Sequence, residues 1–322
     1  MKEKSKERIK TVLKIMVSVG LISYIIYNAG PYKIWSHIQR TNKIFFFIVL
    51  LMAIVKVAIS AKKWQILLKA KDEINNFFYV WKVYYIGTFF NMFLPTNVGG
   101  DVVKAHKMSK VSENTIEAYS SVFMERFTGI IAILSLATVS TTFYLSELPF
   151  EIILTIYGVF LPLIVISFIM ISTKRSVRLL RGLFEKVFSR FNPFSIKEKL
   201  IKLLRSINLY TKKKKALGYS IFISFIFHTL LILSNYILAL SIGLDISLHY
   251  FFIFIPISAI LLFLPISIRG FGVREVLYVY FFTPVGATAA QAVSLSFLVQ
   301  LVSIISSLIG GSVYLASQRE NV

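Results

Sequence analysis

Cysteine is absent from the 322-residue chain. A disulfide framework, a thiolate metal site and a cysteine nucleophile are therefore excluded. Histidine is scarce, and the four histidines show no metal-ligand spacing, so we expect no metal site. The HExxH, GxSxG and Walker A motifs are missing as well. We therefore expect no cofactor, and no soluble stretch is long enough to fold a catalytic domain.

Acidic residues are few, with 15 Asp and Glu against 36 Lys and Arg, which gives a formal net charge of +21. Such an excess raises the question of nucleic acid, but the basic residues lie between apolar blocks, without the glycine or aromatic interleaving of an RNA-binding module. The chain is 56% hydrophobic, and the apolar residues form long blocks. This pattern predicts a multi-pass membrane protein whose charge sets its topology and contacts anionic lipid.

Six stretches are long and apolar enough to cross a hydrocarbon core of about 30 Å. They are residues 11–29, 44–61, 120–146, 150–173, 217–241 and 287–316. The first follows a basic N-terminus and lacks a convincing cleavage site, so we interpret it as an uncleaved span that starts in the cytoplasm. Two further apolar segments, 77–94 and 250–264, each end at a Leu-Pro interruption.

Charge decides the role of these two segments. The linker 174–215 holds 14 of the 36 Lys and Arg, whereas the connections 145–151 and 242–249 hold none. By the positive-inside rule the linker is cytoplasmic and the two connections are external. Segment 77–94 then cannot be a net crossing, and a return crossing just after it would bury several charges. A re-entrant hairpin that enters from the cytoplasm costs less free energy than such a crossing.

The same reasoning applies to the second half with opposite orientation. We therefore predict an all-α polytopic membrane protein of the plasma membrane, with six full spans plus two re-entrant helical hairpins in an inverted-topology repeat and both termini cytoplasmic. The first repeat is 1–146, with its re-entrant motif at 77–104, and the second is 150–322, with its motif at 250–283. The basic linker 174–215 is either an amphipathic helix on the inner leaflet or a solvated connection.

The two interruptions, Phe93–Asp101 and Phe263–Glu275, each place proline, then glycine, then charge within an apolar run. Paired interruptions of this kind point to a binding site in a transporter. Irregular backbone at membrane depth is tolerated only where protein buries it or water reaches it, so each tip is expected to line a cavity.

At the first tip, Gly99 and Gly100 permit close backbone approach, and a helix starting here offers free N–H groups to an anion. Asp101 caps that helix, pairs with a local base or titrates. At the second tip, Arg269 and Arg274 bracket two glycines, and two guanidinium groups can hold a phosphate. The alternatives are that the glycines only allow tight packing and that the two arginines extend to the membrane interface.

The pair Glu125-Arg126 is either an interfacial salt bridge or part of the cavity. For a catalytic role, only the carboxylates of Asp101 and Glu125 are candidates. The candidate substrate-binding residues are Asn91, Pro95, Gly99, Gly100, Asp101, Lys104, Glu125, Arg126, Arg269, Gly270, Gly272, Arg274 and Glu275.

Three linked motifs resemble the transmembrane region of the lysylphosphatidylglycerol synthase family, also called the flippase-like domain family. They are Asn91–Pro95 continuing through Gly99–Ala105, then Met124–Gly129, then Leu264–Ser267 with Gly270, Gly272, Val273, Arg274 and Glu275. The resemblance implies a membrane domain that handles or translocates lipids. In the synthases a cytoplasmic aminoacyl-transferase domain follows. Here the sequence ends at Val322, so we expect the membrane part without synthase activity. The family pattern leads us to expect an uncharged residue where Arg269 stands.

Three functions follow as hypotheses. The first is a translocator of an anionic phospholipid or a lipid-linked headgroup. The second is a membrane-embedded transferase that uses Asp101 or Glu125 as general base. The third is a membrane partner of a separate synthase, and a homo-oligomer is also possible.

Overall fold

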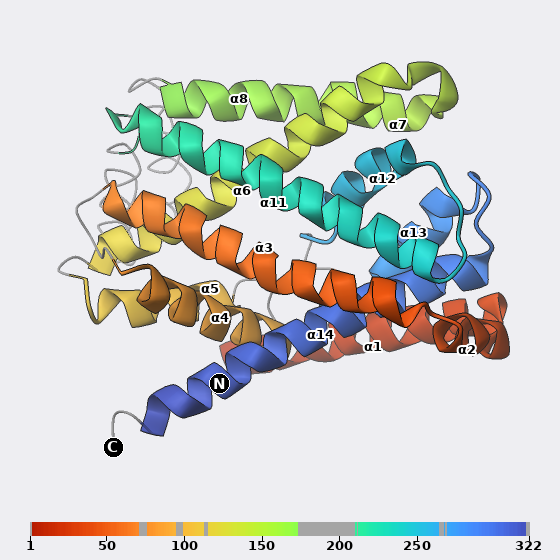
Figure 1. Cartoon of the computed structure of the whole chain (residues 1–322), viewed down its shortest axis with the longest axis horizontal. Coiled ribbons are helices and arrows are strands. Elements are labelled where there is room, and N and C mark those ends of the chain that lie inside the picture. Colours follow the sequence, from red (N-terminus) through yellow and green to blue (C-terminus); the bar gives the residue numbers. More distant parts are fainter. Residues whose placement is uncertain are drawn as a thin grey trace. The chain divides into compact units, whose positions relative to one another are not determined.

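The computed structural model describes residues 2–70, 76–94, 99–112, 115–172, 210, 212–263, 267 and 269–319. Throughout these ranges the regular elements are helices, without strands, as expected for an all-α membrane protein (Figure 1). The elements are α1 Lys2–Ala29, α2 Pro31–Gln39, α3 Lys43–Lys69, α4 Phe77–Phe93, α5 Gly99–Ser109, α6 Thr115–Phe143, η1 Leu145–Glu147, α7 Phe150–Thr155, η2 Ile156–Phe160, α8 Leu161–Ser172, α11 Lys214–Ser241, α12 Leu248–Leu261, α13 Val273–Phe282 and α14 Ala289–Arg319.

Each predicted span coincides with helix. Five helical stretches in the described ranges are long and apolar enough to cross a membrane, and the bent pair α1–α2 makes a sixth if it counts as one span. The stretch predicted as one span at 150–173 is α7, a π-helical turn and α8 in succession. The wider turn ends where Pro162 cannot donate a backbone hydrogen bond to residue 158.

A helix that the sequence did not lead us to expect, α2, follows α1 after a bend of 83°. Gly30 forms the bend with a φ of 85°, and Pro31 is the first residue of α2. Glycine adopts this left-handed conformation without steric cost, and proline favours the first turn of a helix because it needs no hydrogen-bond acceptor there.

Helix α3 extends to Lys69, well past the end at residue 61 that we predicted. Lys62 and Lys63, which directly follow the predicted span, lie inside the helix. The helix continues because Trp64, Leu67 and Leu68 are almost fully buried and hold this last part against its neighbours.

The chain forms two compact units. Unit 1 comprises Met1–Lys56, Tyr85–Gly100 and Thr229–Val322, and unit 2 comprises Val57–Tyr84 and Asp101–His228. Helices α3, α4, α5 and α11 each supply residues to both units. The predicted repeats, 1–146 and 150–322, describe sequence order and stay a prediction.

In unit 1, helix α14 packs against α2 and α13, and α1 packs against all three. The apolar core between these helices contains Ile25, Ala29, Ile34, Ala290 and Val293. Helix α13 therefore packs against both α1 and α14. This helix starts directly after the second interruption.

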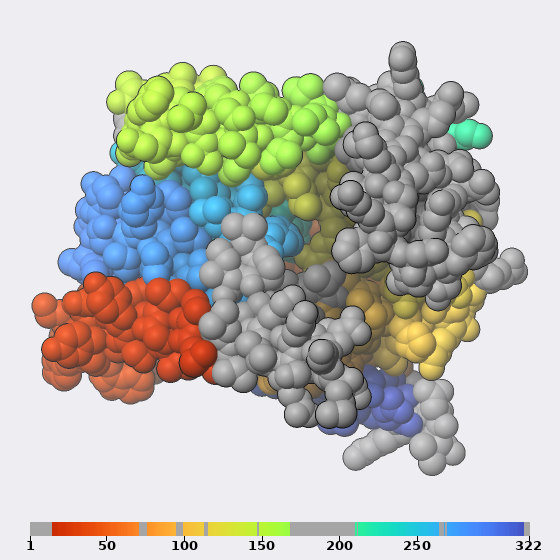
Figure 2. Space-filling model, turned by 180° about the vertical axis from the view of Figure 1, so that it is seen from behind, coloured from red at the N-terminus to blue at the C-terminus, as the bar shows by residue number. Residues whose placement is uncertain are grey.

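In unit 2, the core is built by the end of α3, the start of α4, and helices α5 and α6. It contains Trp64, Leu68, Val80, Val83, Ala105, Met108, Ala118 and Val122. Helix α8 lies against α6, and α7 and α8 form an unbroken band of the surface (light green in Figure 2). Leu154, Val159 and Leu163 are half exposed on these elements. Such an apolar face suits contact with lipid.

Each interruption joins two short helices, α4 to α5 and α12 to α13. The predicted site residue Pro95 and the residues Leu264–Ile266 lie outside the described residues. So does the predicted basic linker 174–215, except for 210 and 212–215.

Candidate functional site

Helices α4 and α5 approach closely at Gly100. The backbone N–H of Gly100 donates a hydrogen bond to Oδ1 of Asn91, at 2.8 Å. A Cβ added at Gly100 would collide with the backbone oxygen of Gly87. Gly100 therefore allows tight packing of α5 against α4, which was the alternative to a role in ligand binding. Asn91 satisfies one of the N–H groups that the start of α5 leaves free.

Asp101 does not cap α5. The helix begins at Gly99, so Asp101 is its third residue. Its Oδ2 accepts a hydrogen bond from Nε of Arg126 at 2.7 Å, and its Oδ1 lies 3.2 Å from Nζ of Lys104. Of the three roles that the sequence left open for Asp101, the structure shows pairing with local bases.

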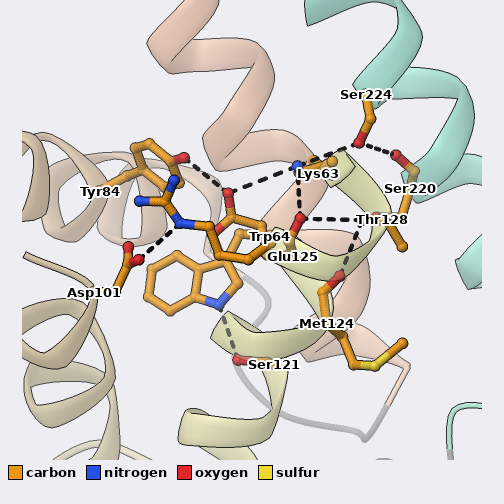
Figure 3. Close-up of polar contacts among 12 residues, drawn as sticks. Lys63, Trp64, Tyr84, Asp101, Ser121, Met124, Glu125, Thr128, Ser220 and Ser224 are labelled. Atoms are coloured by element: carbon orange, nitrogen blue, oxygen red, sulfur yellow. Dashed lines mark hydrogen bonds and ion pairs between the residues drawn. The ribbon is translucent and has the colours of Figure 1, made fainter. Parts of the chain in front are cut away.

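Glu125 of α6 is buried at the centre of a set of donors (Figure 3). Tyr84 donates its hydroxyl proton to Oε1 at 2.8 Å, and Lys104 donates to Oε2 at 2.8 Å. The Nζ of Lys63 lies 3.7 Å from Oε1. Both carboxylate oxygens are therefore engaged, and one carboxylate stands between two lysines.

The two lysines have further partners. Lys104 lies over the rings of Tyr84 and Trp64, at 4.1 and 5.3 Å from the ring centroids, which are favourable cation–π distances. Lys63 donates to the backbone oxygen of Glu125 at 3.0 Å and to the hydroxyl of Ser224 at 3.3 Å (Figure 3). Buried cations are tolerated when paired in this way.

We call Lys63, Asp101, Lys104, Glu125 and Arg126 the paired cluster. It lies wholly in unit 2 and joins α3, α5 and α6. Its three cations face two carboxylates. The surplus positive charge is least buried at Arg126, whose side chain is 38% exposed whereas the other four are 7% exposed or less.

The second interruption ends in a tight turn before α13. Arg269 has a φ of 55°, and Gly270 and Gly272 have φ values of 78° and 84°. The N–H of Arg274 donates to the oxygen of Gly270 at 2.8 Å, which closes the turn. A Cβ at Gly272 would lie 2.7 Å from Cβ of Leu21, so glycine is required there on two grounds.

Both carboxylate oxygens of Glu275 accept hydrogen bonds from groups other than the two arginines. Its Oε2 accepts the N–H of Gly272 at 2.7 Å, and its Oε1 accepts the hydroxyl of Ser296 at 2.7 Å. The side chain is fully buried. This carboxylate thus caps α13 and anchors it to α14.

Arg269 and Arg274, which we call the arginine pair, lie within electrostatic reach of each other in unit 1. Three of their nitrogens, Nε and Nη1 of Arg269 and Nη1 of Arg274, are buried without a hydrogen-bond partner among the described residues. Within those residues no carboxylate forms an ion pair with either arginine. Unpaired buried donors of this kind are rare and call for a ligand or another explanation.

One turn beyond Arg274, helix α13 is tied to α11. The hydroxyl of Tyr278 donates to Oδ1 of Asn235 at 2.7 Å, and both groups are buried. In unit 2, Nε2 of His228 donates to the oxygen of Gly129 at 3.0 Å. This histidine is an interhelical hydrogen bonder, the more common role of a lone intramembrane histidine.

Sequence reasoning missed Lys63, Tyr84 and Ser296 as members of these sites. Lys63 is 62 positions from Glu125, and no local pattern joins them. The only signal was the run Trp64–Leu68, whose apolar residues continue the helix beyond the lysines. For metals, the described part of the chain holds no group of three His, Asp or Glu that could bind an ion.

Helices of spanning length, charge kept in buried clusters and broken helices with arginines beside them define a polytopic helical membrane protein. Residues 11–311 match the family described as the lysylphosphatidylglycerol synthase TM region. The chain belongs to this family.

A curated relative supports the same assignment. A UPF0104 membrane protein from Pyrococcus horikoshii is 27% identical over 329 residues, a match that covers 96% of this chain and 98% of that protein. No solved structure matches the chain significantly.

Proposed function

We propose that this protein is a flippase-like lipid translocase that moves an anionic phospholipid or a lipid-linked headgroup between the leaflets of the plasma membrane. The observation that carries the proposal is the arginine pair. Its buried N–H groups lack partners among the described residues, and guanidinium groups bind phosphate oxygens in bidentate fashion. Membership of the lysylphosphatidylglycerol synthase TM family makes a lipid the natural source of that phosphate.

The proposal includes six spans and two re-entrant hairpins in an inverted repeat. Helix lengths support the hairpins. At 1.5 Å per residue, α4 with 17 residues is about 26 Å long and α12 with 14 residues about 21 Å, both short of a core of about 30 Å. Entry of the two hairpins from opposite sides would let rocking of the repeats expose a headgroup to either leaflet.

A reconstitution experiment tests the function. The purified chain is placed in liposomes that contain a tail-labelled anionic phospholipid, and the label exposed on the outer leaflet is followed by quenching. We expect transfer above that of empty vesicles, and its loss in the double variant Arg269→Gln/Arg274→Gln. The exposed Arg40 provides the matched control, because Arg40→Gln makes the same chemical change at the end of α2. Absence of transfer for every anionic lipid tried would refute the proposal.

Topology is tested separately by single-cysteine labelling, which the cysteine-free chain allows without background. Cysteines at Ser146 and Asp245 are expected to react with a membrane-impermeant maleimide from outside the cell. Both lie in connections without Lys or Arg. Labelling of Asp245→Cys only from the cytoplasm would rule out the inverted repeat and cytoplasmic termini.

The transferase hypothesis has less support. A general base needs a carboxylate oxygen within reach of a substrate proton. The carboxylates of Asp101 and Glu125 both form ion pairs with lysine or arginine side chains instead. The third hypothesis, docking of a separate synthase through the linker 174–215, stays a prediction.

A further inference from the structure

The arginine pair combines two positive charges with three buried donor nitrogens that lack hydrogen-bond partners among the described residues. We infer that its ligand is a phosphomonoester, a terminal phosphate with close to two negative charges, and that this headgroup is preferred over a phosphodiester. The inference rests on the proposed function, since it names the substrate class for the same site.

The first argument is the count of hydrogen-bond donors. Three buried guanidinium nitrogens lack partners in the described part of the chain: two on Arg269 and one on Arg274. A phosphomonoester presents three strong acceptor oxygens, whereas a phosphodiester has two of its oxygens esterified and presents two. The monoester therefore offers one more charged acceptor oxygen than the diester.

The second argument is charge. No carboxylate of the described residues forms an ion pair with Arg269 or Arg274, and both oxygens of the neighbouring Glu275 carboxylate are hydrogen-bonded to Gly272 and Ser296. Two positive charges are left to be balanced in a medium of low dielectric constant. A phosphomonoester brings about 1.5 to 2 negative charges at neutral pH, and a phosphodiester brings one.

The third argument is rigidity. Arg269 is held at a positive φ, which non-glycine residues seldom adopt, and Arg274 is tied to the same turn through its N–H bond to Gly270. Tyr278 and Glu275 fix the following helix to α11 and α14. The backbone that carries both arginines is thus preorganised, so a ligand has only their side chains to order.

The test compares two lipids in the same proteoliposomes: tail-labelled phosphatidic acid as the phosphomonoester and tail-labelled phosphatidylglycerol as the phosphodiester. We expect phosphatidic acid to be transferred at least about tenfold faster, the effect of one additional charge-assisted hydrogen bond. Arg269→Gln should reduce this ratio to near one, and Arg40→Gln should leave it unchanged. Equal transfer of both lipids by the unaltered chain would overturn the inference and leave the proposed function standing.

A binding measurement keeps the inference testable if neither lipid is transferred, an outcome that counts against the proposed function alone. Short-chain versions of both lipids are titrated into the full chain in detergent, with size-exclusion profiles to show that each variant is folded. Tighter binding of the phosphomonoester, lost in Arg269→Gln, supports the inference, and equal affinity refutes it. Inorganic phosphate is the competitor: displacement of the lipid at equal concentration would assign the site to free phosphate and overturn a lipid ligand.

Discussion

The paired cluster and the arginine pair differ in whether their positive charges have partners within the protein. In the paired cluster three cations share two carboxylates, and each carboxylate is bonded from two sides. In the arginine pair, two cations stand beside a glutamate whose oxygens are both bonded elsewhere. The difference separates two uses of charge: a cluster that satisfies itself stabilises the fold, whereas donors that the fold leaves unsatisfied are available to a ligand.

The largest effect is expected at Glu125. Glu125→Gln removes the charge that compensates Lys63 and Lys104, and the amide NH2 replaces one of the two oxygens that accept from Tyr84 and Lys104. Breaking a buried ion pair by removing one partner costs about 3–5 kcal/mol. Thermal unfolding in detergent should report this loss.

The matched control is Glu151→Gln, an exposed glutamate in the first turn of α7, which should change stability by less than about 0.5 kcal/mol. Equal melting temperatures for the two variants would mean that the paired cluster does not stabilise the fold.

Asp101→Asn should destabilise the fold less, because Lys104 keeps Glu125 as a partner while Arg126 loses its ion pair with Asp101. We expect a loss of about 1–3 kcal/mol for a broken charge-assisted bond. A double-mutant cycle with Arg126→Gln isolates the interaction, and Asp245→Asn in an exposed loop is the control. Additive effects in the cycle would show that Asp101 and Arg126 are not coupled.

Glu275→Gln tests the capping role of the sequestered glutamate. The amide keeps one acceptor oxygen, so we expect a loss of about 1 kcal/mol, typical of a weakened helix cap. Lipid transfer should fall as well, since the turn that holds both arginines loosens. A variant with normal stability and slower transfer would instead place the carboxylate in contact with the ligand.

The smallest effect on stability is expected at the arginine pair. Arg269→Gln removes the charge of a half-buried side chain that forms no ion pair in the described residues, so the free energy of unfolding should stay the same or rise, by no more than about 1 kcal/mol. Lipid transfer should nevertheless fall. A loss of stability as large as that of Glu125→Gln would mean that Arg269 has a structural partner, and the contrast between the two regions would disappear.

Hydrophobic blocks were enough to locate the long helices. Every stretch predicted to cross the membrane is helical, because a bilayer admits few alternatives to a continuous helix. Helix ends were harder to predict from the sequence. Helix α3 continues past Lys63 because this buried lysine pairs with a residue that is distant in the sequence, and sequence alone does not show such a partner. The bend before α2 depends on one glycine conformation, which Gly30 permits without requiring it.

The candidate sites were predicted in part. The motifs led to Asp101, Glu125, Arg126, Arg269 and Arg274, but not to their division into a paired and an unpaired set. The sequence left a cap, pairing with a local base and titration open for Asp101; the helix starts two residues earlier, and the carboxylate pairs with Arg126. Spacing along the sequence indicates which residues are polar within an apolar region; three-dimensional contacts decide which of them are already satisfied.

Trp64 gives the paired cluster an optical signal. Its indole ring lies under the ammonium group of Lys104, and its N–H donates to Ser121 at 2.9 Å. The chain has only three tryptophans, and Trp35 is 57% exposed. Emission from a buried indole beside a fixed cation differs from that of an exposed one, so fluorescence can follow separation of Lys104 from the ring. Intrinsic fluorescence thus provides a label-free way to observe whether the cluster stays closed while lipid is moved.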